Sequence, residues 1–262
     1  MEILITNDDG WGAKGILTIV RIMSELGHVT VVAPDGARSG MSNAITVTQP
    51  IYLRPLNDPS WGTEEWQKNV TVYTTNGTPS DCVKLAIDVV CEGDSSKIDL
   101  LVSGINHGSN AGINVIYSGT IGACFVGAEH GIPSIGFSLC DHDADADFEP
   151  SLPYFEQIIA KTIQSGMPKD ICLNVNAPKG EVKGIRACRQ AEGRWANDFG
   201  KTDAPRACDY YWLIGDFMFL NDNDMKADQC AIENGYITVV PLQFDMTAYK
   251  AIEFCKQYET EA

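Results

Sequence analysis

The amino-acid sequence predicts an α/β protein with an open, mostly parallel sheet and helices on both faces, followed by a C-terminal antiparallel arm and a terminal helix. Up to about residue 178, short apolar runs typical of buried strands alternate with segments whose apolar residues recur at helical spacing. Beyond that point, strand-like runs follow one another almost without helices. We therefore divide the chain into a core, residues 1–178, which carries the chemical site, and an arm for self-association, residues 179–262.

The chain opens with a strand–helix–strand unit. Glu2–Thr6 is the first apolar strand, and the apolar residues of Ile16–Leu26 are spaced as on one face of a helix that ends at Gly27. Val29–Ala33 has the composition of a second strand. Strands joined through a helix in this way run parallel, which places the unit in the core of the sheet.

An insert separates this unit from the next helix. Ala44–Leu53 and Val70–Thr75 alternate apolar and polar residues, which predicts two strands of an antiparallel insert. The sequence Thr78-Pro79-Ser80-Asp81 marks a helix start, because proline is favoured in the first helical turn. We expect this helix to continue through Cys82–Cys91.

A strand, a glycine-rich turn and a helix start follow one another from Asp99 to Gly131. Asp99–Val102 is a short apolar run typical of a buried strand, and from Thr120 small and apolar residues recur at helical spacing. The glycines of the turn permit backbone angles that let amides point towards a ligand. They are Gly104, Gly108, Gly112 and Gly119. With a helix dipole at Ser118-Gly119-Thr120, this stretch predicts an anion cradle; a polar surface loop is the alternative.

The remaining elements complete the core and the arm. They are the strand Ile132–Leu139, the helix Leu152–Gln164, the strands Ile171–Val175, Val182–Gln190, Tyr210–Leu220 and Tyr236–Val240, a short helix near Asp224–Glu233 and the terminal helix Met246–Tyr258. An arm of this kind has too little core of its own. We therefore expect it to bury its apolar face on a second subunit.

Charge and composition exclude several classes of partner. The chain carries 19 Lys and Arg against 35 Asp and Glu, a net charge of -16, which repels nucleic-acid polymers and anionic membrane surfaces. No apolar run approaches the roughly 20 residues of a membrane-spanning helix. The nine cysteines are scattered without a Cys-x-x-Cys pair, as is typical of reduced thiols. The N-terminus shows no signal peptide, so we expect a cytoplasmic protein.

Three loops that follow predicted strands carry oxygen-bearing side chains. Asp8 and Asp9 follow the first strand, Ser39 lies after the second, and Asn106 lies after Asp99–Val102. Ligands bind beyond the carboxyl ends of the strands in open α/β sheets, so we expect these side chains to converge. A cation relieves the repulsion between neighbouring carboxylates, and hard oxygen donors suit Mg²⁺ or Mn²⁺, and Ca²⁺ less well. The alternative interpretation is that Asp8 and Asp9 are only a helix cap and turn before Ala13.

Six segments spread over nearly the whole chain form a set. They are Ile3–Gly10 (ILITNDDG), Ala33–Thr46 (APDGARSGMSNAIT), Asn76–Val83 (NGTPSDCV), Ser103–Gly112 (SGINHGSNAG), Tyr117–Ala123 (YSGTIGA) and Gly235–Leu242 (GYITVVPL). In this order they resemble the SurE family of survival proteins, which are metal-dependent 5′-nucleotidases. The resemblance implies a Rossmann-like core, a homodimer or tetramer with exchanged C-terminal arms, and one divalent ion per subunit.

The resemblance also implies the site residues and the reaction. The family's metal ligands fall on Asp8, Asp9, Ser39 and Asn106, and its phosphate-site residues fall on Asn110, Ser118, Gly119 and Thr120. The implied reaction is hydrolysis of nucleoside 5′-monophosphates to nucleoside and phosphate, with 3′-nucleotides and polyphosphate as further candidate substrates.

In the implied mechanism, Asp8 or Asp9 accepts the proton of the attacking water. The amides of Gly119 and Thr120 and the Ser118 hydroxyl hold the phosphoryl oxygens. We leave the histidines at 107 and 130 outside this set, because a lone histidine is more often structural. Three positions depart from the family's pattern, namely Asn114 in place of Asp, Val126 in place of Glu and Val240 in place of Thr.

Three other classes compete with this interpretation. A phosphatase with an aspartyl intermediate needs two aspartates separated by one residue, whereas Asp8 and Asp9 are adjacent. A dinucleotide-binding oxidoreductase needs Gly-x-Gly-x-x-Gly after the first strand, where Asn7-Asp8-Asp9-Gly10 stands instead. A non-enzymatic nucleotide-sensing module binds without turnover, and the intact ligand positions disfavour it.

Overall fold

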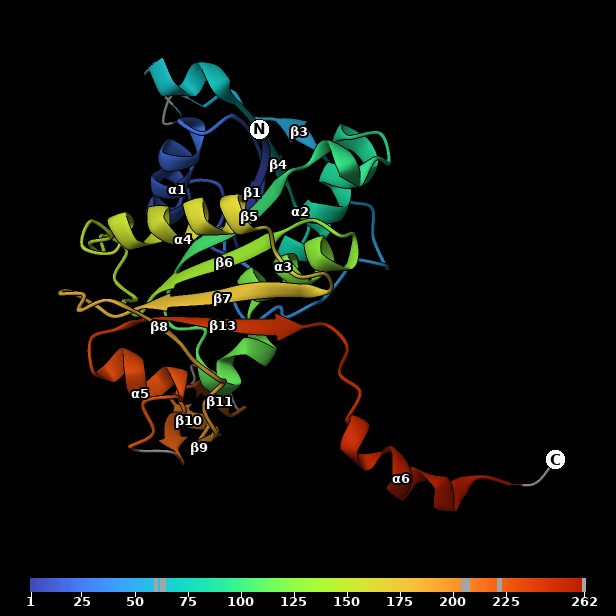
Figure 1. Cartoon of the computed structure of the whole chain (residues 1–262), viewed down its shortest axis with the longest axis vertical. Helices are drawn as coiled ribbons and strands as arrows, with labels where there is room; N and C mark the ends of the chain where they lie inside the picture. The colour runs from blue at the N-terminus through green and yellow to red at the C-terminus, as the bar shows by residue number, and fades with distance from the viewer. Residues whose placement is uncertain (59–60, 62–64, 204–207, 221–222, 261–262) are drawn as a thin grey trace.

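A central sheet of parallel strands organises the computed structural model, which describes residues 1–58, 61, 65–203, 208–220 and 223–260. The strands of this sheet are β1 (Glu2–Thr6), β2 (His28–Pro34), β3 (Arg54–Pro55), β4 (Val70–Thr75), β5 (Leu100–His107), β6 (Ser134–Leu139), β7 (Ile171–Ala177), β8 (Ile185–Ala187) and β13 (Ile237–Gln243). Among the described residues they lie in the order β3-β4-β2-β1-β5-β6-β7-β13-β8 (Figure 1). Every neighbouring pair from β4 to β7 is parallel, which confirms the predicted fold class.

Helices cover both faces of this sheet (Figure 1). They are α1 (Lys14–Ser24), α2 (Pro79–Leu85), α3 (Gly119–Glu129), α4 (Leu152–Ser165) and α5 (Asp228–Glu233); a further helix, α6 (Ile252–Cys255), lies outside this arrangement. One apolar layer joins α1 and α4 to the sheet, and a second layer joins α2 and α3 to its other face. The helix predicted over Cys82–Cys91 continues α2 as a π-helical turn, Ala86–Val90.

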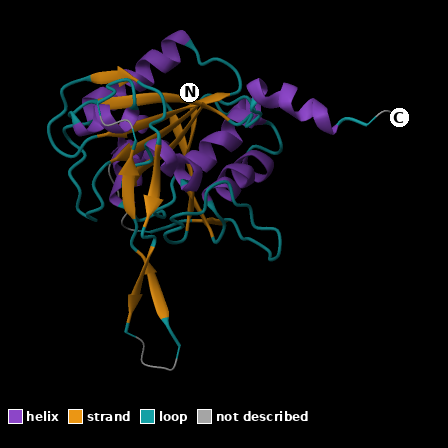
Figure 2. Ribbon diagram, turned by 90° about the horizontal axis from the view of Figure 1, so that it is seen from below, coloured by secondary structure: helices purple, strands orange, loops and turns teal. Residues whose placement is uncertain are grey.

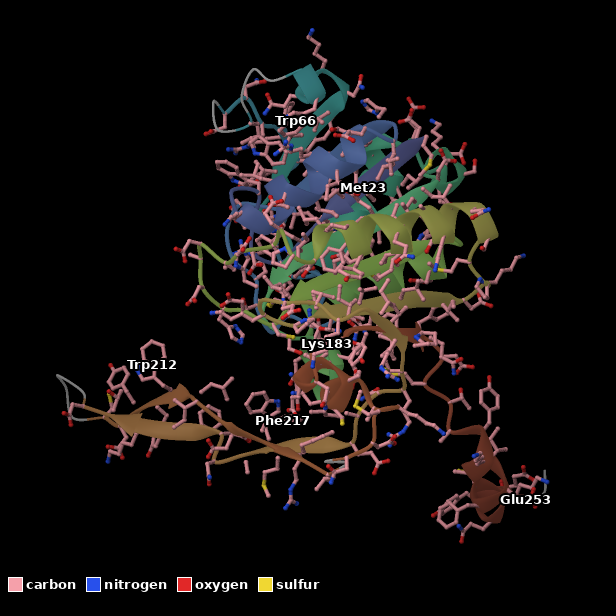
Figure 3. The ribbon with its side chains drawn as sticks, turned by 60° about the vertical axis from the view of Figure 1, so that its left-hand side comes forward. Met23, Trp66, Lys183, Trp212, Phe217 and Glu253 are labelled. Atoms are coloured by element: carbon pink, nitrogen blue, oxygen red, sulfur yellow. The ribbon has the colours of Figure 1, made fainter. Side chains whose placement is uncertain are left out.

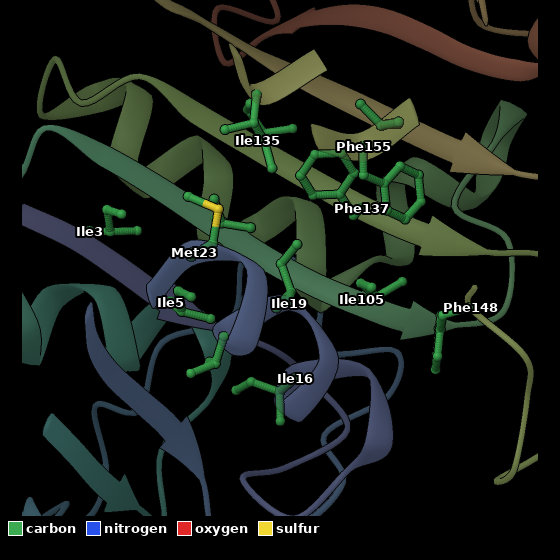
Figure 4. Close-up of a cluster of buried hydrophobic side chains, with 14 of the residues drawn as sticks. Ile3, Ile5, Ile16, Ile19, Met23, Ile105, Ile135, Phe137, Phe148 and Phe155 are labelled. Atoms are coloured by element: carbon green, nitrogen blue, oxygen red, sulfur yellow. The ribbon is translucent and has the colours of Figure 1, made fainter. Parts of the chain in front are cut away.

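The apolar periodicity of the sequence explains the first layer, shown in Figure 4. Ile16, Ile19 and Met23 lie on one face of α1 and are fully buried against the sheet. On the neighbouring part of this layer, the rings of Phe137 and Phe155 lie 4.5 Å apart between β6 and α4. This burial fixes the helices on the sheet and thereby fixes the loops at the ends of its strands.

Four strands within the predicted arm form a two-stranded ribbon that stands out from the body of the molecule (Figure 2). Its strands are β9 (Gly193–Ala196), β10 (Phe199–Thr202), β11 (Tyr210–Leu213) and β12 (Asp216–Phe219). Antiparallel pairing joins β9 to β12 and β10 to β11. The helical end of the chain around α6 also lies away from the sheet (Figure 1).

The structure corrects the predicted insert. Ala44–Leu53 contains no strand, and only the short β3 pairs antiparallel with β4. Val70–Thr75, expected in an antiparallel insert, is β4 and pairs parallel with β2 at the edge of the core sheet. Alternation along a strand reports which face is buried and does not report the direction of its partner, so this prediction was wrong.

Several element boundaries also differ from the prediction, among them those of the strand predicted over Val182–Gln190, which is reduced to β8. β5 continues through Ser103 and Asn106, which were expected in a loop, because it keeps its pairing with β6 after a shift of register. Tyr210–Leu220 is two strands, β11 and β12. The terminal helix begins at Tyr249, after a turn closed by the Thr247 amide donating to Asp245 Oδ1, and it consists of short helical pieces.

Two strands from beyond residue 178 belong to the central sheet. β13 pairs antiparallel with β7 and parallel with β8. The ribbon is therefore an excursion between strands of one sheet, and the division of the chain near residue 178 stays a prediction. All nine cysteines lie in described segments, and none of them is joined to another by a disulfide bond there. Within those segments, no helix has both the length and the apolarity needed to cross a membrane.

Candidate active site

The ends of β1, β2 and β5 meet at the carboxyl edge of the sheet. β1 pairs in parallel with both neighbours, so all three strands end on the same side. The amide of Arg38 donates to the main-chain oxygen of Asp8 at 2.6 Å, and the amide of His107 donates to Asp9 Oδ2 at 3.2 Å. These bonds bring the two aspartates together with the residues that adjoin Ser39 and Asn106.

Asp8 is the more buried of the two carboxylates, at 5% exposure. Its Oδ1 accepts a hydrogen bond of 2.6 Å from the hydroxyl of Thr120, in the first turn of α3. Burial first, and then the charge of Asp9, raise the pKa of Asp8 to about 7, although the Thr120 hydrogen bond acts in the opposite direction. A carboxylate in this state gains strongly from a nearby cation.

Asp9 is more open to solvent, and burial also raises the pKa of its carboxyl. The His107 amide and the imidazoles of His107 and His142 lower that pKa. Each aspartate therefore has one oxygen held by a neighbouring residue, Oδ1 on Asp8 and Oδ2 on Asp9. The remaining oxygen of each carboxylate is the one available to a ligand.

Asn106 and Ser39 add neutral oxygen donors. The side-chain amide of Asn106 donates from Nδ2 to the Gly108 main-chain oxygen at 2.8 Å, which fixes the side chain and leaves Oδ1 as an acceptor. Ser39 is exposed in the loop after β2. That loop is held at its far end, where Thr46 Oγ1 donates to Asp81 Oδ2 at 2.6 Å.

The chemistry of these donors fits a hard divalent cation. In the part of the chain that the structure describes, no group of three or more His, Cys, Asp or Glu side chains gathers as a metal site. A cation at the end of β1 would thus be shared between two carboxylates and the neutral oxygens of Asn106 and Ser39. Oxygen donors of this kind match Mg²⁺ or Mn²⁺ and do not match the nitrogen and sulfur ligands preferred by zinc.

The start of α3 lies directly against Asp8. A Cβ added at Gly119 would lie 3.0 Å from Asp8 Cβ and 3.1 Å from Pro79 Cγ, so glycine allows this close approach. Ser118 is the N-cap of the helix, and its Oγ accepts a hydrogen bond of 3.1 Å from the Ile121 amide. Amides in the first turn of a helix have no acceptor within the helix. The amides of Gly119 and Thr120, and the Ser118 hydroxyl proton, can serve an anion.

Asn110 has its contacts on the neighbouring strands of the sheet. Its Nδ2 donates to Ser138 Oγ at 2.8 Å, and its main-chain amide donates to Asn176 Oδ1 at 2.8 Å. Asn174 Nδ2 in turn donates to the Asn110 main-chain oxygen at 2.8 Å. The structure therefore places Asn110 in a buried amide network on β6 and β7, which orders the glycine-rich stretch between β5 and α3.

Two residues that support the site were not identified from the sequence. Asp81 forms a capping box with Thr78 and also receives the Thr46 bonds, so one carboxylate anchors both α2 and the Ser39 loop. A Thr-x-x-Asp pattern before an apolar run signals such a box. At Gly122, an added Cβ would lie 2.2 Å from the Ser42 main-chain oxygen, so α3 rests on the Ser39 loop at this point. No local sequence signal reports that contact.

The two histidines considered from the sequence have different surroundings. His107 packs edge-on against Phe148 with ring centroids 5.1 Å apart, and its Nδ1 lies 2.9 Å from the Asp143 main-chain oxygen. His130 lies at the opposite end of α3, where its Nδ1 is 2.9 Å from the Val126 main-chain oxygen. His130 is therefore remote from the end of β1. His107 lies at the edge of the site and connects it to the loop that carries Asp143, before α4.

Known proteins similar to this chain identify its family. The family model described as survival protein SurE matches residues 3–197. A Flavobacterium psychrophilum protein named 5′-nucleotidase SurE is 46% identical over 98% of this chain and 97% of its own length, and one of the same name from Bacteroides thetaiotaomicron is 45% identical over 98% and 97%. The crystal structure of SurE from Aquifex aeolicus gives a TM-score of 0.80 at 33% identity, over 99% of this chain and 100% of that one. The chain belongs to the SurE family of survival proteins.

Proposed function

We propose that this protein is a metal-dependent 5′-nucleotidase, a phosphomonoesterase that hydrolyses nucleoside 5′-monophosphates to nucleoside and phosphate. The observation that carries the proposal is the contact between Asp8 and the first turn of α3 through the Thr120 hydroxyl and the absent side chain of Gly119. This contact supports a cation site beside an anion site. Relatives of nearly the same length bear the name 5′-nucleotidase, which supports the assignment.

The metal ligands in this proposal are Asp8, Asp9, Ser39 and Asn106, holding one Mg²⁺ or Mn²⁺ per subunit. When bound, the ion neutralises charge on the phosphoryl group and makes a water molecule a better nucleophile at neutral pH. The net charge of -16 repels phosphate compounds at long range, so a local cation is needed to attract them.

The protein's own residues divide the remaining work. Asp9 is the more exposed of the two carboxylates, so it is the one that accepts the proton of the attacking water. Asp8 stays fixed by the Thr120 hydroxyl. The amides of Gly119 and Thr120 and the Ser118 hydroxyl receive the phosphoryl oxygens at the positive end of the α3 dipole. Asn110 holds the glycine-rich stretch before α3 in place through its hydrogen bonds to β6 and β7.

Self-association is a further part of the proposal. Large apolar side chains are exposed along the ribbon and the C-terminal segment, among them Phe199, Tyr211, Trp212, Leu213, Met246, Phe254 and Tyr258. Exposed apolar area of this size marks an interaction surface, and a second copy of the chain is the partner we propose. The assembly is a homodimer or a tetramer, located in the cytoplasm.

A substrate panel on the full-length protein tests this function. Nucleoside 5′-monophosphates, 3′-monophosphates and polyphosphate are offered after treatment with a chelator and again after addition of Mn²⁺ or Mg²⁺. We expect release of phosphate from 5′-monophosphates only with added metal, and its loss in Asp8→Asn. Asp88→Asn, an exposed carboxylate on the π-helical turn after α2, is the control and retains activity. Full activity in excess chelator, with no ion found by elemental analysis, contradicts the proposal; binding without turnover favours the sensing module.

A further inference from the structure

A buried carboxylate at the root of the arm has no part in the mechanism above. Asp228, the first residue of α5, is 0% exposed, and none of the described Lys, Arg or His side chains forms an ion pair with it. Burial raises the pKa of this carboxyl, against the effect of hydrogen bonds from main-chain amides. A carboxylate is kept in such a place only where several donors satisfy it, so the donors indicate what it holds together.

Main-chain amides from two distant segments supply these donors. Asp228 Oδ2 accepts from Gly112 at 3.0 Å, and Oδ1 accepts from Ala191 at 2.8 Å as well as from the adjacent Gln229 at 2.8 Å. Gly112 begins the 3₁₀ helix η5 (Gly112–Tyr117), which runs directly into the N-cap of α3. Ala191 lies between β8 and β9, where the ribbon begins. One carboxylate therefore joins the arm to the turn that precedes the anion cradle.

A second connection runs from the ribbon to the same turn. Trp195 of β9 donates from Nε1 to Asn114 Oδ1 at 2.8 Å, and its ring packs edge-on against Phe217 of β12 with centroids 5.5 Å apart. Figure 3 shows Phe217 in the half of the ribbon nearest the body, with Trp212 towards the far end. Asn114 is one of the positions that departs from the family's pattern, and here it is the acceptor for the arm.

The other end of η5 contacts the metal-ligand loop. The Ser42 amide donates to the Tyr117 main-chain oxygen at 3.0 Å, and Ser42 Oγ donates to the Ile116 main-chain oxygen at 2.7 Å. η5 therefore lies between the arm on one side and the loop of Ser39 on the other. Its place is set by these hydrogen bonds together with the burial of Gly112 and Val115.

We propose that Asp228 is a positioning residue: by fixing η5 to the root of the arm, it sets where Ser118 and the first amides of α3 lie. The arrangement of the arm is thereby transmitted to the phosphate half of the site. This inference rests on the proposed function only because it takes Ser118 and the first amides of α3 to bind phosphate.

Hydrogen exchange measures the positioning role directly. In Asp228→Asn, one carboxylate oxygen becomes an NH₂ group that cannot accept from a main-chain amide. We expect exchange at residues 118–121, which Asp228 does not touch, to become faster by roughly tenfold, as for the loss of a hydrogen bond to a charged group. The control is Asp224→Asn, which removes a half-buried carboxylate that pairs with Arg189 and accepts from the Lys226 amide in the turn before α5. It leaves exchange at 118–121 unchanged.

Affinity measurements separate positioning from general loss of structure. We expect Asp228→Asn to weaken inhibition by inorganic phosphate several-fold while the Mn²⁺ affinity, measured by calorimetry, stays within about twofold. Trp195→Phe is the milder second variant, because it removes the donor to Asn114 and keeps a ring against Phe217. It should change phosphate affinity and exchange at 118–121 in the same direction.

Unchanged exchange at residues 118–121 in a folded Asp228→Asn protein overturns the inference. If that variant does not fold, an unchanged Trp195→Phe protein overturns it instead. Equal loss of phosphate and Mn²⁺ affinity also overturns it, because that result indicates a general disturbance. Failure of the wild-type protein to hydrolyse nucleotides removes the proposed function, and the exchange experiment still decides the role of Asp228.

Discussion

β5 and β11 both carry large apolar side chains, but in opposite surroundings. β5 is buried along its whole length except at His107, whereas Tyr210, Tyr211, Trp212 and Leu213 of β11 are all exposed. β5 has a strand on each side and helices on both faces. Among the described residues, β11 pairs only with β10. Apolar side chains thus complete a core in one region and, in the other, leave an exposed surface that is available for the proposed self-association.

Stability should differ most between these two strands. Ile105→Ala on β5 removes a fully buried side chain, and we expect it to lower the free energy of unfolding by about 2–5 kcal/mol. Leu213→Ala on β11 removes a side chain that is 74% exposed, and we expect a change within about 0.5 kcal/mol for the dissociated chain. Urea unfolding at low protein concentration measures both. Similar losses for the two variants would show that the ribbon is part of the core.

Catalysis should also depend on the end of β5 and not on β11 of the ribbon. Asn106→Ala removes a proposed metal ligand, and we expect turnover of a nucleoside 5′-monophosphate to fall on the order of 100-fold or more. Leu213→Ser should stay within about twofold of the wild-type rate per subunit. Steady-state assays with saturating Mn²⁺ compare them. An Asn106→Ala enzyme of normal rate would remove this residue from the site.

Self-association should depend on the ribbon and not on the core, which is the reverse of what we expect for catalysis. Trp212→Ser removes a large exposed ring, and we expect the concentration at half-assembly to rise about tenfold. Val89→Ser is the matched control, because Val89 is 57% exposed on the core, away from the ribbon. Sedimentation velocity across a concentration series gives both values. A full-length protein that is monomeric at micromolar concentration would contradict the assigned role of the arm.

The smallest expected effect lies inside the site. Thr120→Val removes the hydroxyl that lowers the pKa of Asp8, so the pKa of Asp8 rises further above about 7. At pH 7 more of the Asp8 carboxyl is then protonated, and protons compete with Mn²⁺ for it. We expect a loss of Mn²⁺ affinity of a few-fold at pH 7 that largely disappears by about pH 9. Calorimetry at the two pH values tests this. A loss independent of pH would point to altered geometry.

The sequence predicts the core well because its elements carry strong local signals. The helical spacing of Ile16, Ile19 and Met23 defines α1 and its buried face, and the polar residues after β1 mark the edge where ligands bind. The partner of β4 could not be predicted, because the residues that pair with it lie far away in the chain. The same holds for the place of β13 within the central sheet.

The candidate site also contains residues that the sequence predicts and residues that it does not. Asp8, Asp9 and Thr120 could be named from motifs, and the structure brings Asp8 and Thr120 into contact. The supporting residues, such as Asp228, are ordinary side chains in sequence, and only the folded chain shows which amides they hold. The metal and phosphate roles of the individual residues remain predictions. Local patterns report a residue's chemistry, whereas its partners are set by long-range packing.

The position of the ribbon between strands of one sheet has a consequence for the continuity of the backbone. β13 returns after the ribbon and pairs with β7 through six residue pairs, from Thr238↔Asn176 to Gln243↔Ile171. A single cleavage of the chain between β10 and β11 would therefore leave two fragments that remain joined by this ladder. The site residues named here from Asp8 to Thr120 would all lie on the first fragment, and Asp228 would lie on the second. The proposed site residues would thus come from one piece, and the carboxylate that we propose to position them would come from the other.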